Sequence, residues 1–165
     1  LDSARADLIR QRIDALKAAI SEGGPREAAI RSLLYIRAPD GVADERGFNL
    51  LRQLRQKTNS GMSLVDFKSL VRDQFLMLVL DEQRAVDAIG PMLARDPDLA
   101  GEMAKKLRKI LDVVAVQSDE SKVRLEKITR VFRRAEKQER NGIKARGTAP
   151  IEHRPATTRT RSARH

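Results

Sequence analysis

The most informative part of the chain runs from Phe67 to Ile89, where an amphipathic pattern turns into an unbroken apolar run. Up to this run, apolar residues recur at steps of three and four, the period of one helix face. Residues 75–80 (FLMLVL) are then all apolar, so a helix here would present apolar side chains on every side. Such a helix has to be enclosed by other segments. The pattern therefore predicts a buried central helix at about residues 63–80.

The rest of the chain has the same helical period and no strand signals, which predicts an all-α fold. We expect a single bundle of six to eight helices over residues 1–140, packed around the central helix. Stripes and stop signals predict helices at about 2–22, 26–37, 44–58, 63–80, 81–89, 97–114 and 118–140. Gly90-Pro91 is expected to end the 81–89 helix. Short polar residues ahead of four helices predict N-caps at Ser63, Asp81, Asp96 and Ser118.

From Asn141 onward the periodicity is lost. Residues 141–165 contain six basic residues against one acid, Glu152, and almost no large apolar side chain. Such a composition cannot bury enough apolar area to offset its conformational entropy, so we expect a disordered basic tail. Its arginines could make loose contact with a polyanion such as nucleic acid, or the tail could be a solvated extension. The candidate anion contacts are Arg159, Arg161 and Arg164.

Composition narrows the class of protein. The 165 residues fit one domain. There is no cysteine, which excludes disulfides and thiolate metal sites and suits a cytoplasmic location. No apolar run approaches the roughly 20 residues of a membrane span. The chain starts at Leu1 within a helical pattern, from which we expect it to be the end of a longer protein.

The search for catalytic chemistry is largely negative. Both histidines, His153 and His165, lie in the predicted tail, so a preorganised Ser-His-Asp or histidine metal site in the fold is not available. The nearest match to a nucleophile elbow, residues 61–65 (GMSLV), lacks the second glycine and the preceding strand. Ser63 is therefore interpreted as a helix cap. The sequence predicts no catalytic residue and no cofactor.

One acidic corner is a weak candidate for a cation site, formed by Asp40, Asp44 and Glu45. It lacks the alternating oxygen ligands and the closing glutamate of a calcium loop. The alternative is a turn acid followed by acids at a helix N-terminus, where the helix dipole favours negative charge.

Two segments carry a resemblance to a known family. Residues 27–56 and 63–89 resemble the C-terminal helical region of bacterial polyhydroxyalkanoate-synthase-like proteins. The most specific elements are DERGF (residues 44–48) and the FK-x-LVR-x-QF pattern (residues 67–75), within a similarity that covers about residues 1–135. The stretch DGVADERGFNLLRQL also resembles the tellurite-resistance B-like helical module.

The first resemblance implies a parent protein whose upstream part is an α/β-hydrolase domain, an acyltransferase or a hydrolase. Its nucleophile, Asp and His would lie upstream, so no catalytic residue is transferred to this chain. The first hypothesis is a non-catalytic accessory domain that docks onto the upstream α/β-hydrolase-like domain or self-associates. The alternatives are a cytosolic stress-response module that binds an ion at the acidic corner, and a nucleic-acid-associated protein that uses the tail.

Overall fold

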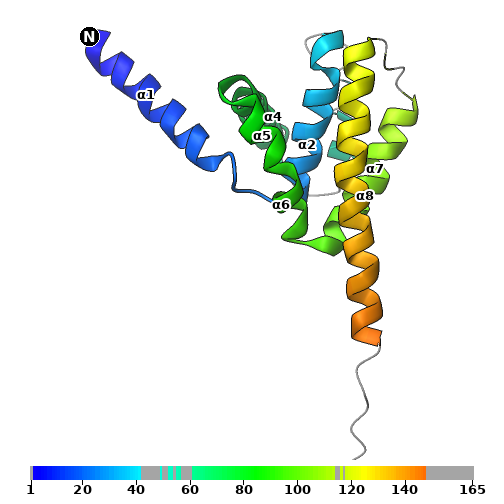
Figure 1. Ribbon diagram of the computed structural model, residues 1–165. Coiled ribbons are helices and arrows are strands. Elements are labelled where there is room, and N and C mark those ends of the chain that lie inside the picture. The colour runs from blue at the N-terminus through cyan, green and yellow to red at the C-terminus, as the bar shows by residue number, and fades with distance from the viewer. Residues whose placement is uncertain are drawn as a thin grey trace, which may run out of the picture.

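The fold is an all-α bundle with a projecting arm. The computed structural model describes residues 2–41, 49, 52–53, 55–56, 61–113, 116 and 118–147, and all regular secondary structure there is helical. Helices α2, α7 and α8 stand side by side, while α1 leaves the bundle as an arm (Figure 1). The elements are α1 (Asp2–Ala19), α2 (Pro25–Arg37), the 3₁₀ turn η1 (Ala38–Asp40), α4 (Leu64–Leu80), α5 (Glu82–Asp87), α6 (Ile89–Ala94), α7 (Pro97–Val113) and α8 (Asp119–Gly147).

The four predicted N-caps are confirmed. In each, a side-chain oxygen accepts a hydrogen bond from the backbone N–H three residues later, which would otherwise lack a helical partner. Each such cap stabilises its helix by about 1 kcal/mol, so these positions determine where the helices begin. The pairs are Ser63 with Asp66 at 3.1 Å, Asp81 with Arg84 at 3.2 Å, Asp96 with Leu99 at 3.1 Å, and Ser118 with Ser121 at 3.1 Å.

The centre of the bundle is α2, and the prediction that residues 63–80 form the buried central helix is wrong. Every residue from 28 to 37 is buried, and α2 packs against α4, α5, α6, α7 and α8. In α4, Phe67, Met77 and Leu78 are buried, whereas the Phe75 side chain is 41% exposed and that of Val79 64%. The chain encloses α4 on its α2 side and leaves the opposite side open.

The sequence predicted the helix at 26–37, but it did not predict that this helix is the centre, because several of its buried residues are polar. Arg31 and Ser32 are fully buried and Arg37 is 6% exposed, so they do not mark a wet face. The Ser32 hydroxyl donates to the carbonyl oxygen of Ala28 at 2.6 Å, which satisfies it inside the core. Buried polar groups are tolerated where they are hydrogen-bonded in this way.

Near its C-terminal end, α2 is also joined to α8 by Arg124. The Arg124 guanidinium lies 4.5 Å from the centre of the Tyr35 ring and donates to the Tyr35 carbonyl oxygen at 2.9 Å. Burial is the main cause that raises the pKa of the Tyr35 hydroxyl, which the nearby Arg124 charge partly opposes. The cation–π contact connects helices far apart in sequence.

Gly90-Pro91 does not end a helix as expected. Helix α5 ends at Asp87, and α6 runs from Ile89 to Ala94 through both residues. Pro91 is the third residue of α6, within the first turn, where a backbone N–H has no intrahelical acceptor and its loss costs no bond. The break therefore comes two residues earlier than predicted, at Ala88.

The last helix is longer than expected. Helix α8 continues to Gly147, so residues 141–147 are helical and the predicted tail boundary at residue 141 is wrong. The apolar stripe ends near Ala135, and beyond it the helix continues with good helix formers such as Lys, Glu and Gln. Residues 148–165, the rest of the predicted tail, lie outside the described residues.

The predicted helix at 44–58 also lies mostly outside the described residues. Those that are described there, residues 49, 52–53 and 55–56, are helical. Its expected inward residues, Phe48, Leu51 and Leu54, are not among them.

Substitutions in α2 and α4 test which helix is the centre. Ile30→Ala should lower the free energy of unfolding by about 2–5 kcal/mol, because the Ile30 side chain is 1% exposed and its loss leaves a cavity. Phe75→Ala should cost about 1 kcal/mol or less, because much of its ring already contacts water. Urea unfolding of the two variants measures both values. If the two variants lost equal free energy of unfolding, α2 would be no more central than α4, contrary to this description.

Candidate functional site

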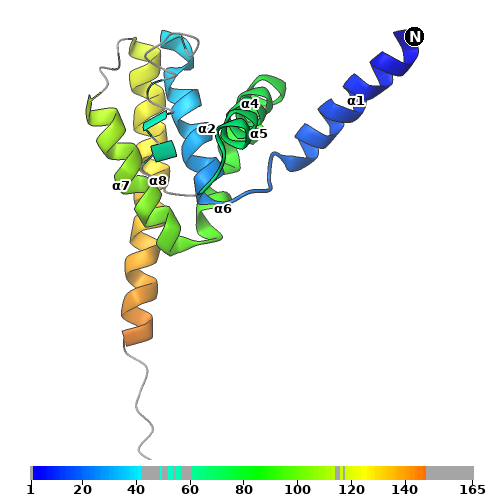
Figure 2. The same ribbon diagram turned by 180° about the vertical axis from the view of Figure 1, so that it is seen from behind.

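The arm, α1, contacts the bundle through its C-terminal half and leaves its N-terminal half open. Views from both sides show the arm reaching away from α2 with α4 between them (Figure 2). Leu16 and Ile20 are buried, whereas the Leu8 side chain is 66% exposed and that of Ile9 53%. The predicted apolar stripe of α1 therefore exists, but only its last part is covered.

The open part of this stripe faces α4 across a groove of about 410 Å³, called here the α1–α4 groove. Its accessible lining is almost entirely apolar, and Arg5 and Arg12 stand at its border. A second hollow of about 430 Å³, between α5, α6 and α8, mixes polar with apolar side chains. The α1–α4 groove is lined by Leu8, Ile9, Ile13 and Leu16 of α1 and by Leu76, Val79 and Leu80 of α4.

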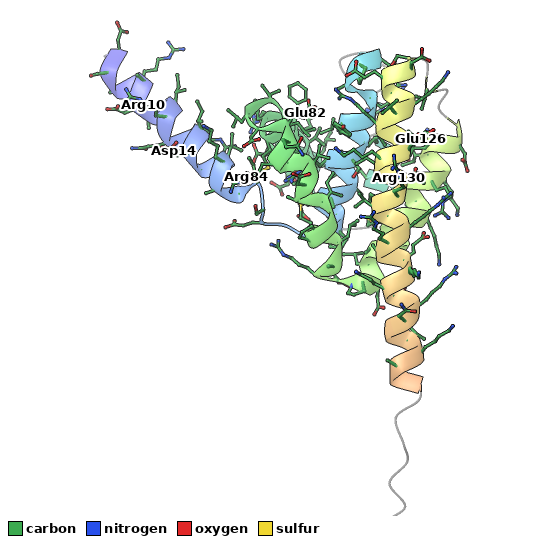
Figure 3. The ribbon with its side chains drawn as sticks, in the orientation of Figure 1. Arg10, Asp14, Glu82, Arg84, Glu126 and Arg130 are labelled. Carbon is green, nitrogen blue, oxygen red and sulfur yellow. The ribbon has the colours of Figure 1, made fainter. Side chains whose placement is uncertain are left out.

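Polar contacts hold the arm at its angle to α4. Midway along α1, Arg12 pairs with Asp73 of α4 at 2.6 Å. At the end of α1, Arg95 donates to the carbonyl oxygens of Ser21 and Gly23. Arg10 and Asp14, on either side of Arg12 along the arm, lie among side chains that reach into open space (Figure 3). The arm is thus fixed at its base and middle, so the groove has two positioned walls.

Arg31 supplies the deepest of these contacts. Its guanidinium is fully buried and donates to the carbonyl oxygens of Ile20 and Ala85, both at 2.9 Å. It also donates to the Gln74 side-chain oxygen at 2.9 Å and to the Met77 sulfur at 3.2 Å. One side chain therefore joins the end of α1 to α2, α4 and α5.

Burial lowers the pKa of Arg31 to about 10, although the charge of Glu27 acts in the opposite direction. At neutral pH the guanidinium is still charged. Because the unfolded chain holds this proton more tightly than the folded one, the titration of Arg31 raises stability only above about pH 10.

Of the predicted cation corner, the structure describes Asp40 alone. Asp40 uses one carboxylate oxygen to accept the Ser118 N–H at 3.0 Å, and its other oxygen lies 3.9 Å from Arg37. It therefore connects η1 to the start of α8. Asp44 and Glu45 lie outside the described residues, and within the described ones no group of three or more His, Cys, Asp or Glu could hold a metal ion.

Two further predictions concern Ser63 and the arginines of the predicted tail. Ser63 is the cap of α4, as expected. Arg159, Arg161 and Arg164 lie outside the described residues, so contact with anions there stays a prediction. No helix in the described part of the chain has an apolar stretch long enough to cross a bilayer.

Sequence reasoning missed the α1–α4 groove, although its residues were identified. It assigned residues 75–80 to the core, and it left two uses for the stripe of the first helix, packing on the central helix, which it preferred, or burying a partner helix. The surplus of amphipathic helices indicated a docking surface, but it did not show that α1 and α4 form it together.

Comparison with known proteins gives one informative similarity. The chain is 35% identical over 127 residues to an uncharacterized protein encoded in the ackA 5′ region of Rhizobium meliloti. The alignment takes in 76% of this chain but 17% of that relative, so the chain spans about a sixth of the relative's length. No family model and no solved structure matches the chain.

Removal of the buried guanidinium tests how the arm is held. Arg31→Ala should lower the free energy of unfolding by roughly 2–5 kcal/mol, because it leaves a cavity and unpaired buried carbonyl oxygens. Arg12→Ala is the control; its ion pair is partly exposed and should contribute about 0.2–1 kcal/mol. Denaturant unfolding gives both values. Equal losses would mean that Arg31 does not organise the core.

Asp40 is tested separately. Asp40→Ala should cost about 1–2 kcal/mol, because the Ser118 N–H loses a charged acceptor. The same cost should appear in EDTA and in millimolar Ca²⁺ in thermal melts. If Asp40→Ala lowered stability only in the presence of Ca²⁺, the Asp40 carboxylate would instead be a metal ligand.

Proposed function

We propose that this chain is a non-catalytic accessory domain of a longer, cytoplasmic, polyhydroxyalkanoate-synthase-like protein. In this proposal, the α1–α4 groove docks onto the upstream α/β-hydrolase-like domain of the same protein. The observation that carries the proposal is the apolar surface that the domain's own chain leaves uncovered between α1 and α4.

The groove exposes apolar side chains on both of its walls. Leu8 and Ile9 of α1 and Val79 of α4 are each exposed by 53% or more. Soluble domains seldom leave connected apolar surface of this kind open, unless it serves an interaction. Removing apolar area from water contributes about 25 cal/mol per Å² to binding, which the loss of freedom on association partly offsets. Covering these apolar residues with another domain would therefore favour binding at the groove.

Contacts within the chain fix the two walls of the groove in the absence of a partner. Arg12 pairs with Asp73, and Arg31 holds the carbonyl oxygen of Ile20 at the base of the arm. A surface fixed in advance loses little conformational entropy on binding, so more of the burial energy appears as affinity. A loose terminal helix would not have this advantage.

The shape and border of the groove favour a helix as its occupant. A third helix can lie between two helices and insert apolar residues spaced three and four apart. The charged residues at the border are Arg5 and Arg12, both on α1, and Arg12 is already paired with Asp73 of α4. An acidic residue beside the apolar stripe of the partner would therefore pair with Arg5.

The comparisons support a domain that works within a longer chain. In the Rhizobium meliloti protein, the similar region is a small part of the whole. The resemblance to polyhydroxyalkanoate-synthase-like proteins suggests that an α/β-hydrolase-like domain occupies the rest. Catalysis would then belong to that domain, and this one would position or stabilise it.

Val79→Asp tests the groove, and Val123→Asp is its matched control. Both valines are exposed to nearly the same extent, 64% and 63%, but Val123 lies on α8 away from the groove. We expect Val79→Asp to weaken co-purification with the separately expressed remainder of the parent protein at least about tenfold, because a charge would be buried. Neither variant should shift the thermal midpoint by more than a few degrees.

Equal binding by the two variants would contradict docking at the groove. If the isolated domain dimerises through Val79 and the remainder of the parent does not bind, the occupant is a second copy, and the proposed partner is wrong. Light scattering of the wild type and the Val79→Asp variant separates these outcomes.

A further inference from the structure

Helix α8 carries a second surface, independent of the groove. Its last buried residue is Ala135, and twelve more helical residues follow, to Gly147. This end projects past all the other labelled helices, and its side chains reach into open space (Figures 1 and 3). Between residues 127 and 147 the sequence has eight basic residues and two acids.

These charges are sorted by face. We define the α8 basic stripe as five exposed residues spaced three or four apart, which lie on one side of the helix. The two acids face α7 instead: Glu136 accepts a hydrogen bond from Arg108 at 2.8 Å, and the carboxylate of Glu139 lies over Gly101. The stripe consists of Arg130, Arg133, Lys137, Arg140 and Lys144.

We propose that the α8 basic stripe binds the phosphate backbone of nucleic acid without sequence preference. Like charges at this spacing repel one another and destabilise a helix, so a polyanion along the stripe would relieve the repulsion. The stripe runs from residue 130 to residue 144, fourteen helical rises that together measure roughly 21 Å. This length allows several successive phosphates to be contacted, each contact releasing condensed counterions.

The composition of the stripe favours nucleic acid over an anionic membrane. A helix that lies in a bilayer surface needs apolar residues beside its cations, and the stripe has none. Ile143, the exposed apolar residue of this end, lies about 100° around the helix from the middle of the stripe, in line with the buried Phe132, and is a single side chain rather than an apolar face. The stripe also has no aromatic residue to stack on bases, so recognition is confined to phosphates.

The test measures binding of the full chain to a fluorescent 20-base-pair DNA duplex by anisotropy, over a range of salt concentrations. The stripe variant replaces Arg133, Lys137, Arg140 and Lys144 with Gln. The control removes the same number of charges from exposed positions on other helices, as Lys17→Gln, Arg84→Gln, Lys105→Gln and Lys109→Gln. A third protein ends at Gly147.

We expect the stripe variant to bind at least about tenfold more weakly at 0.1 M salt. The slope of log affinity against log salt should fall by roughly 3 to 4, since each phosphate contact contributes ~0.9. The control and the shortened protein should each retain most of the affinity and the slope.

Three results would overturn the proposal: no wild-type binding at low salt, equal losses in the stripe and control variants, or loss confined to the shortened protein. Stronger binding to phosphatidylserine vesicles than to DNA would also overturn it, in favour of a membrane surface. A change in the groove, such as Val79→Asp, should leave DNA binding intact.

Discussion

The interaction on which the structure depends is the buried guanidinium of Arg31. A charge inside an apolar core is tolerated only where acceptors surround it. Here they come from three separate segments: the Ile20 carbonyl at the end of α1, Gln74 of α4 and the Ala85 carbonyl of α5. Satisfying this one side chain therefore places three elements around α2. Two of them, α1 and α4, are the walls of the groove, so the core and the candidate site share a cause.

The parts of this fold that could be predicted from the sequence are local. The N-caps at Ser63, Asp81, Asp96 and Ser118 were predictable because each depends on one side chain and an N–H three residues away. The all-α class followed from periodicity in the same way. Helix ends were less certain: Pro91 was expected to stop a helix, but it lies in a first turn, where proline is tolerated.

Long-range packing could not be predicted from the sequence. Arg31, Ser32 and Arg37 have the composition of a wet face, yet they lie at the centre of the bundle. Distant groups satisfy Arg31, the Ala28 carbonyl one turn earlier in α2 satisfies Ser32, and Asp40 lies near Arg37. The apolar run at 75–80 has the composition of a core, yet Phe75 and Val79 remain open. Sequence shows how much apolar surface a helix has. It does not show whether the same chain or another domain covers it.

The way Arg95 holds the base of the arm has a consequence for divergence among relatives. Its acceptors, like one of those of Arg31, are main-chain carbonyl oxygens of the segment after α1, which every amino acid possesses. The geometry of this junction therefore depends little on the identity of Ser21 or Glu22, both exposed. Related chains can carry other residues at positions 21 and 22 and keep the same junction, provided that Arg31 and Arg95 are retained.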